Sequence, residues 1–303
     1  MSNPRTRKRW VAILLVGVPA WLLISALAGL WLYFWNEGKE KAIEQARFTQ
    51  NISVPSLQDD LTKFVQIIGE RNLSSEKAAA NLGKASAMIQ GSLGPSNTGY
   101  AIMLERSTGD FPIIQVRITG KSDQSPIWVV TSYDSRPGSP GVEANATGLT
   151  ATIAAAQAMA GDTPLRSVHF VFLPHANDPT APKEKTLDGL KQLIAKSADP
   201  SVVIYVEAMG ARESLWLTAP DPNLAALSNT GEIGAVIAMD EAFPDGNAAD
   251  FAKVLFSTGL PTLRVATRPA VAVSEPDDQP APPTTVAASA GRLVDLIRRC
   301  AAK

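Results

Sequence analysis

Cysteine is almost absent from this chain of 303 residues, which contains only Cys300. No disulfide can therefore form within the chain, so its stability has to come from an apolar core, and Cys300 is expected to be a packed thiol. An excess of positive charge is absent as well, because the formal net charge is −1 and basic residues cluster only at the amino terminus. This composition argues against a nucleic acid partner.

Internal repeats and a second apolar core are also absent. The residues from about Asn36 onward are therefore predicted to form one sizeable α/β domain. The G-x-S-x-G motif, which places a nucleophilic serine in α/β-hydrolases, does not occur either. Its absence argues against a serine hydrolase of that kind.

One long apolar run is present, from Trp10 to Trp35. About 20 apolar residues cross the roughly 30 Å hydrocarbon layer of a bilayer as a helix, so this run is long enough to span it. Basic residues precede the run and acidic residues follow it, and the positive-inside rule then places residues 1–9 in the cytoplasm. The chain is predicted to be a single-pass protein of an inner or plasma membrane, with 10–35 as a signal anchor and the main domain periplasmic or extracellular. A cleaved signal peptide is the alternative, because Ala26-Leu27-Ala28 has the small-x-small form that signal peptidase accepts.

The remainder divides into a charged, helix-forming stalk over 36–55 and a globular domain over 56–303. Helices are predicted at 56–72, 74–91, 145–160, 183–196, 248–256 and 284–302. Strands are predicted at 100–105, 113–119, 127–131, 167–173, 202–206, 213–218, 234–239 and 262–266. The first two strands are expected to pair as a hairpin and to be edge strands. The others alternate with helices, which predicts a parallel sheet covered by helices, with ligands beyond the carboxyl ends of its strands.

Polar motifs stand at those carboxyl ends. The strand at 127–131 leads to Ser132-Tyr133-Asp134, and Gly141-Val142-Glu143-Ala144-Asn145-Ala146-Thr147-Gly148 follows. The later strands lead to Ala176-Asn177, to Glu207 within IYVEAMG, and to Val273-Ser274-Glu275-Pro276-Asp277-Asp278. The residues of these motifs and their order along the chain resemble the motifs of the di-zinc aminopeptidase family. This family includes bacterial leucyl aminopeptidases, glutamate carboxypeptidases and glutaminyl cyclases. The resemblance covers most of the domain and implies a three-layer αβα fold with a mixed, mainly parallel central sheet.

The resemblance also implies a degenerate metal site, in which the family's ligands are replaced. Serines stand at the two histidine positions, Ser132 and Ser274, and Asn177 stands at a carboxylate position. Glu143 and Glu207 remain as anionic residues where the family has aspartates. Zinc is held by imidazole, thiolate or carboxylate groups, so hydroxyls and an amide are poor substitutes.

The general base of the family corresponds to Ala176, whose methyl group cannot carry a proton. Neither a catalytic residue nor a metal cofactor is therefore expected. The expected function is that of a membrane-anchored pseudo-peptidase, a binding or scaffold subunit that holds a peptide or protein partner in its cleft. The alternative is an active metallo-aminopeptidase or related hydrolase with an atypical metal site.

A residual site is a further alternative for the remaining polar groups. Asp134, Glu143, His175 and Glu207 could hold zinc or a single hard divalent cation such as Ca²⁺ or Mg²⁺. If Glu143 and Glu207 lie close together, a cation or an arginine is needed between them to offset their repulsion. Ser132, Asp134 and His175 could instead form a serine nucleophile, an orienting acid and a base. Asp134 could equally bond the amides of a loop, as aspartates in turns do.

Overall fold

The computed structural model describes residues 18–31, 33–34, 52–106, 109–228, 233–244 and 250–302. The chain divides into two units, Met1–Gln50 and Asn51–Lys303. Residues 18–31 and 33–34 of the first unit are helical. None of the helices in the described part of the chain has the length and hydropathy that a bilayer crossing needs. The remainder of the expected anchor at 10–35 and residues 36–51 of the expected stalk lie outside the described residues, so the anchor stays a prediction.

The second unit is built on an eight-stranded sheet with the order β1-β2-β4-β3-β5-β8-β6-β7. The strands are β1 (Ile102–Glu105), β2 (Ile113–Ile118), β3 (Ile127–Ser132), β4 (Val168–Leu173), β5 (Val202–Val206), β6 (Leu215–Thr218), β7 (Gly234–Val236) and β8 (Thr262–Ala266). The central strands β4, β3, β5 and β8 run parallel, with Val129 of β3 opposite both Phe170 and Ile204. Antiparallel pairs flank them, since β2 pairs with β1 and β4, and β6 pairs with β8. The predicted mixed sheet with a parallel centre is confirmed.

The predicted hairpin of β1 and β2 is confirmed, but the expectation that both are edge strands is wrong for β2. Of these two strands, β1 lies at an edge of the sheet and β2 does not, because β2 also pairs along its other side with β4. Ile113, Ile114 and Val116 of β2 are fully buried. The apolar residues of β2 thus belong to the core and not to an exposed edge.

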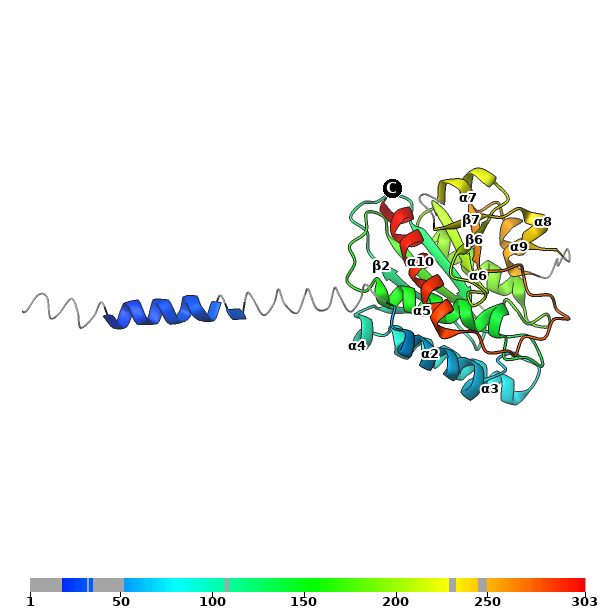
Figure 1. The fold of residues 1–303 in the computed structure, drawn as a ribbon, viewed down its shortest axis with the longest axis horizontal. Helices are drawn as coiled ribbons and strands as arrows, with labels where there is room; N and C mark the ends of the chain where they lie inside the picture. Colours follow the sequence, from blue (N-terminus) through cyan, green and yellow to red (C-terminus); the bar gives the residue numbers. More distant parts are fainter. Residues whose placement is uncertain are drawn as a thin grey trace, which may run out of the picture. The chain divides into compact units, whose positions relative to one another are not determined.

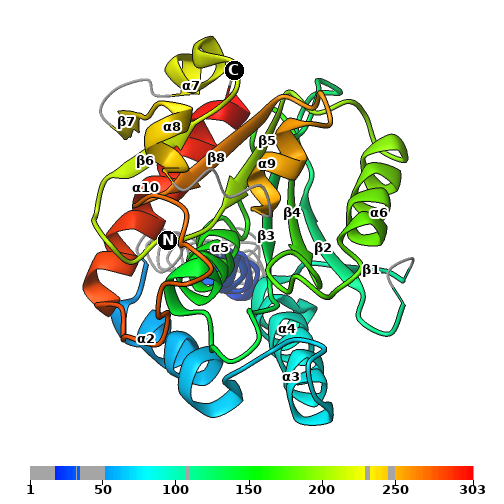
Figure 2. The same cartoon turned by 90° about the vertical axis from the view of Figure 1, so that its right-hand side faces the viewer.

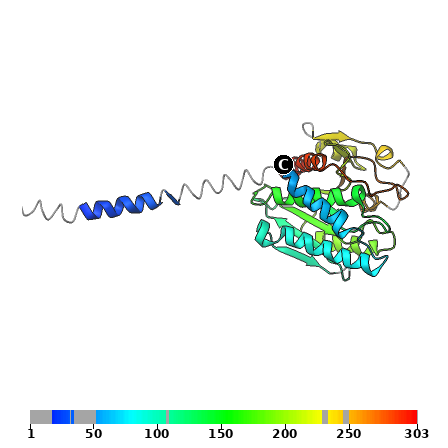
Figure 3. The same cartoon turned by 60° about the horizontal axis from the view of Figure 1, so that its bottom comes forward.

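Helices cover both faces of this sheet. One face carries α2 (Val54–Thr62) with the π-helical turn η1 (Lys63–Ile68), α3 (Glu76–Leu93), α5 (Thr147–Ala158) and α10 (Pro283–Ala302). The other carries α6 (Lys183–Ala195), α8 (Met239–Ala242) and α9 (Phe251–Phe256). The short elements α4 (Pro95–Thr98), η2 (Val142–Ala146) and α7 (Pro222–Ser228) complete the described helices. Figure 1 and Figure 3 show α2, α3, α5 and α10 on a common side, and Figure 2 shows α6 and α9 across the sheet from α2 and α10.

The three layers follow from the alternation of side chains along the strands. Val129 and Ile204 pack into the core cluster beneath α5 and α10, whereas Val130 and Val203 pack into the cluster beneath α6 and α9. Because both faces are covered, these strands are continuous apolar runs. The carboxyl ends of β3, β4, β5 and β8 therefore meet at one edge of the sheet, where polar residues can gather.

Candidate functional site

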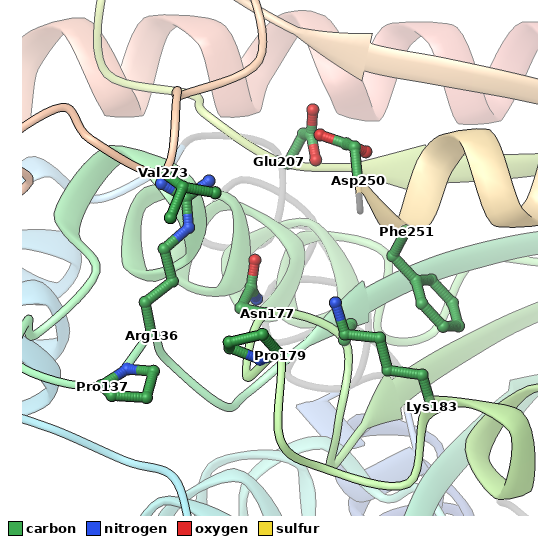
Figure 4. Close-up of a pocket in the computed structure, with 10 residues that line it drawn as sticks. Arg136, Pro137, Asn177, Pro179, Lys183, Glu207, Asp250, Phe251 and Val273 are labelled. Atoms are coloured by element: carbon green, nitrogen blue, oxygen red, sulfur yellow. The ribbon is translucent and has the colours of Figure 1, made fainter. Parts of the chain in front are cut away.

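A pocket of about 250 Å³ lies beyond the carboxyl ends of the central strands. Its polar lining consists of Arg136, Asn177, Lys183, Glu207 and Asp250. Ala176, Phe251, Val273 and two prolines supply apolar lining, and Figure 4 shows the arrangement of these side chains. The pocket brings together residues that follow β3, β4 and β5 with residues from the segment before α9.

Ser132, at the end of β3, belongs to a buried network of neutral groups. Its Oγ accepts hydrogen bonds from the side-chain amides of Asn145 at 2.9 Å and Asn177 at 2.7 Å. The Asn145 amide also donates to the Ser132 carbonyl at 2.6 Å, and its oxygen accepts from Arg71 Nη2 at 2.8 Å. Asn145 lies at a position where a helix cap could be expected, but it instead links Ser132 to the fully buried Arg71.

Asp134, two residues after Ser132, holds the loop that follows β4. Its Oδ2 accepts the backbone N–H groups of Ala176, Asn177 and Asp178 at 2.8–2.9 Å. Burial raises the pKa of Asp134 to about 6, although these amides oppose the rise. Asp134 therefore has the loop-bonding role that its position suggested, and it fixes Asn177 in the pocket.

The structure does not join Ser132, Asp134 and His175 into a proton relay. The Ser132 hydroxyl is bonded to two amides, and the Asp134 carboxylate is bonded to the Ala176 loop. His175 Nδ1 is buried without a hydrogen-bond partner among the described residues, and the ring packs edge-on against Phe111 at 6.0 Å. Burial lowers the pKa of His175, which favours the neutral ring of a core residue.

Glu143 lies on η2, where the chain enters α5. Its carboxylate accepts the Gly210 N–H at 3.2 Å, and burial raises its pKa to about 7. A Cβ on Gly210 would lie 2.0 Å from Glu143 Oε1, so a side chain at residue 210 would displace this carboxylate. A Cβ on Gly148 would lie 2.8 Å from Glu207 Cα, which shows how closely the start of α5 approaches the end of β5.

Asp277, and not Ser274, connects the loop after β8 to this region. The Asp277 carboxylate accepts the N–H groups of Glu143 at 2.6 Å and Ala144 at 3.0 Å, and so caps the first turn of η2. Ser274 is exposed in the same loop. The structure thus brings four of the five predicted metal positions to the edge of the sheet and leaves Ser274 at the surface.

Glu207, at the end of β5, forms a buried ion pair with Arg264 of β8. Arg264 is fully buried, and Asp250 lies beside this pair at the start of α9 (Figure 4). Burial raises the pKa of both Glu207 and Asp250, and the Arg264 guanidinium opposes the rise. Glu207 therefore has Arg264 as its cationic partner, and the only sign of this arginine in the sequence is a charge within the apolar run TLRVA.

The backbone after Glu207 adopts an unusual conformation. Ala208 has a φ of 45°, in the left-handed region that residues other than glycine rarely occupy. Its carbonyl accepts both the backbone N–H of Thr267 at 2.8 Å and the Thr267 hydroxyl at 2.6 Å. The Met209 N–H donates to Thr147 Oγ1 at 2.9 Å. These bonds hold a strained turn that fixes where Glu207 points.

No protein-family model matches the sequence, and no curated protein matches it. Solved structures do resemble the fold. The LapA aminopeptidase of Legionella pneumophila matches with a TM-score of 0.61 at 15% identity, over 88% of this chain and 75% of LapA. A Zn-dependent exopeptidase of Parabacteroides distasonis matches with a TM-score of 0.57 at 12% identity, over 82% of this chain and 98% of that one. The glutaminyl cyclase of Tannerella forsythia matches with a TM-score of 0.52 at 14% identity, over 82% of this chain and 99% of that one.

This domain has the zinc-aminopeptidase fold. The predicted resemblance is confirmed at the level of the fold by these matches.

Within this zinc-aminopeptidase fold, the donor atoms at the predicted metal positions do not fit a zinc ion. Asn177 turns its N–H₂ group toward Ser132, whose hydroxyl already accepts two hydrogen bonds. Glu207 is paired with Arg264, and Glu143 accepts the Gly210 amide. Among the described ranges, no three His, Cys, Asp or Glu side chains come together in the way that a metal ion requires.

Proposed function

We propose that this domain is a non-hydrolytic relative of zinc aminopeptidases, a pseudo-peptidase that binds a ligand or partner at the carboxyl edge of its sheet. The fold and the pocket support this proposal, because proteins of one fold often keep a binding cleft while their chemistry differs. The sequence led us to expect a peptide or protein partner, and the loops at 174–182 and 269–283 border the pocket and could contribute to its contacts.

The observation that carries the proposal is that the polar groups at the predicted metal positions already bond to one another. A zinc ligand needs a lone pair directed at the ion, with its own hydrogen-bond partners outside the coordination sphere. Here the Ser132 lone pairs face amide N–H groups, and the Glu207 carboxylate faces a guanidinium. The cationic side chain of Arg264 thus lies beside Glu207, an anionic residue that a metal ion would need as a ligand.

The residue at the general-base position also supports binding without hydrolysis. Ala176 lines the pocket, and its backbone N–H donates to Asp134. A methyl group can neither take a proton from water nor pass one to a leaving amine. Loss of a general base alone lowers a rate by about 10²–10⁴-fold.

Metal analysis and turnover measured on the same preparation test the proposal. The full-length protein is purified in detergent, dialysed against zinc, and assayed by mass spectrometry for bound metal and with aminoacyl chromogenic substrates for hydrolysis. A known zinc aminopeptidase treated identically serves as the positive control. We expect less than stoichiometric zinc and no turnover above buffer. Stoichiometric zinc together with turnover that a chelator abolishes would establish the alternative, an active metallo-aminopeptidase.

We further propose that residues 10–35 anchor the domain in a membrane, with 1–9 in the cytoplasm and the domain on the periplasmic or extracellular side. Alkaline carbonate extraction of membranes tests the anchor, because an inserted helix stays with the pellet and a peripheral protein is released. Protease protection of intact cells or spheroplasts tests the orientation. Release of the whole protein into the soluble fraction would contradict the anchor.

A further inference from the structure

Arg71 and Arg264 are the arginines that the described part of the chain buries completely. Their partners differ in charge. The Arg71 guanidinium donates to three backbone carbonyls and to the side-chain oxygen of Asn145. The Arg264 guanidinium donates to a carboxylate, that of Glu207. Because a buried charge is costly unless it is paired, Arg264 and Glu207 depend on each other in a way that Arg71 and its neutral partners do not.

Arg264 reaches the carboxyl edge of the sheet from within β8. It lies opposite Tyr205 of β5, and its guanidinium lies over the ring of Phe243 on the face of the sheet that α6 and α9 cover. The neighbouring residues Leu263 and Val265 belong to the core on the opposite face. The alternation of the strand thus places one long cationic side chain among the apolar residues beneath α9.

The Arg264 guanidinium joins four segments of the chain. Its Nε donates to Glu207, directly after β5, and its Nη2 donates to the Arg268 carbonyl, after β8, at 3.2 Å. Its Cζ lies 5.2 Å from the ring centroid of Phe243, directly after α8. Its charge also acts on Asp250, directly before α9. A bound metal ion stabilises a fold in a similar way, by holding groups from separate segments around one positive charge.

Arg264 also has the largest effect of the cations that act on the two carboxylates. Burial raises the pKa of Glu207 to about 7 and raises that of Asp250 as well. Arg264 opposes this rise more strongly than Arg136 does at both residues. The carboxylates at this end of the sheet therefore receive their positive charge from within the chain.

An ion in the pocket could reach these carboxylates. Glu207 and Asp250 both line the pocket, and Figure 4 shows them next to each other with the Asn177 oxygen directed toward them. Carboxylate and amide oxygens are the donors that hard divalent cations prefer. What opposes such an ion is then the positive charge of Arg264 and not a lack of access.

We propose that Arg264 is the resident cation of this site, which holds the Glu207 and Asp250 carboxylates together as a metal ion would and keeps divalent cations out of the pocket. The inference rests on the proposed non-hydrolytic function and extends it, because it assigns the exclusion of metal to the charge of one residue and not only to the replaced ligands. Removal of that charge should therefore turn the pocket into a site for a divalent cation.

Titration of the full-length protein in detergent with manganese(II) tests the proposal. Manganese suits a site of oxygen donors. Its free ion gives an electron paramagnetic resonance signal that decreases on binding. Arg264→Gln removes the charge and keeps an amide that can donate to Glu207. We expect no saturable binding by the wild-type protein up to millimolar manganese, and saturable binding by Arg264→Gln with an affinity at least about tenfold higher, because a like charge beside the ion has been removed.

Three further variants locate the effect. Arg264→Lys keeps the charge and should bind manganese no better than the wild-type protein. Arg264→Gln/Glu207→Gln also removes the carboxylate that Arg264 contacts and should lose the manganese site. Arg298→Gln is the matched control, because it removes the same charge from the ion pair with Asp162 on α10, outside the pocket. Its manganese binding should equal that of the wild-type protein.

Refolding provides a second measurement if Arg264→Gln is unfolded by circular dichroism. The variant is then refolded from urea with and without manganese. We expect manganese to raise the folded yield of Arg264→Gln and to leave that of Arg298→Gln unchanged, since a bound ion stabilises only the state that contains its site. Equal yields with and without the ion overturn the proposal.

The remaining outcomes separate this inference from the proposed function. Folded Arg264→Gln protein without manganese binding, equal binding by Arg264→Lys, or binding that persists in the double variant each overturns the assignment to Arg264. None of these results involves turnover, so the non-hydrolytic proposal is unchanged by them. Zinc-dependent turnover in the wild-type protein overturns that proposal whatever the manganese titration gives.

Discussion

The two halves of the site, at the same edge of the same sheet, are stabilised in different ways. Beyond β3 and β4, Ser132, Asn145 and Asn177 are linked by hydrogen bonds between neutral groups. Beyond β5 and β8, the carboxylates of Glu207 and Asp250 lie near the cationic Arg264, Arg136 and Lys183. The first half is held by hydrogen bonds, whereas the second is held by opposite charges.

This difference indicates which half is more sensitive to the loss of a single group. A hydrogen bond between neutral groups contributes about 0.5–1.5 kcal/mol, because folding replaces bonds to water with bonds to protein. Buried charges are costly unless they are paired, so the charged half depends on keeping its cations and carboxylates together. Loss of a charged partner is therefore expected to cost more than loss of a neutral donor or acceptor.

Replacement of Arg264 is the most severe way to break the charged half. Arg264→Met removes the buried cation and leaves Glu207 and Asp250 facing each other, and removal of one partner from a buried ion pair costs about 3–5 kcal/mol. We expect the free energy of unfolding in urea at pH 7 to fall by that amount. A loss below about 1 kcal/mol would show that the ion pair is not needed for stability.

The double variant Arg264→Met/Glu207→Gln is the matched control. If the cost arises from an uncompensated carboxylate, neutralising Glu207 should restore part of the lost stability, since the two residues are in contact. Equal stability of the single and double variants would assign the loss to packing around the long Arg264 side chain instead.

Asn145→Ala breaks the neutral half and should cost less. It removes the donor to Ser132 and the acceptor of Arg71 Nη2, which leaves a buried charged group with an unmade hydrogen bond. We expect a loss of about 2–3 kcal/mol in urea unfolding. Asn97, whose side chain bonds Gly91 at the surface, provides the control, and Asn97→Ala should change stability by less than about 0.5 kcal/mol. If both variants lost a similar amount of unfolding free energy, the buried hydrogen bonds of Asn145 would contribute no more to stability than the surface bond of Asn97.

The pH dependence of stability gives a smaller effect at Glu143. Burial raises its pKa from 4.5 to about 7, so the native state holds the proton more tightly than the unfolded state does. This contribution is fully present below about pH 4.5 and is lost as the pH rises through about 7. Urea unfolding at pH 5 and pH 8 should show that Glu143→Gln reduces the gain in stability at the lower pH. Identical pH dependence in the two proteins would contradict the raised pKa.

Most of the fold could be predicted because the buried strands have continuous apolar sequences. The runs at 202–206 and 262–266 were predicted with the bounds of β5 and β8, since a strand covered on both faces is apolar throughout. The region after β6 was predicted less well. The strand expected at 234–239 ends at Val236, and α8 begins at Met239, because the apolar run GAVIAM continues to Met239 and does not mark where the strand ends.

Part of each half of the site could also be predicted, whereas the residues that pair with Glu207 could not. Ser132, Asn177 and Glu207 lie at or shortly after the ends of apolar strands, where polar residues are easily recognised. Arg264 lies inside a strand, and the pattern gives no indication of a partner that follows a different strand. Asp250 was included in a helix predicted at 248–256, but it precedes α9 and caps it. Such pairings depend on three-dimensional proximity, which periodicity does not encode.

Ser132→Ala should have the smallest effect of the four changes within the site. Its loss leaves the Asn145 amide bonded to the Ser132 carbonyl and the Asn177 amide within reach of Asp134, so neither amide becomes fully unpaired. We expect a loss of about 1 kcal/mol in urea unfolding, against less than about 0.5 kcal/mol for Ser274→Ala in the exposed loop. We expect the neutral network to tolerate the loss of one group better than the charged pair does. If Ser132→Ala lowered the free energy of unfolding as much as Arg264→Met, this expected difference would be contradicted.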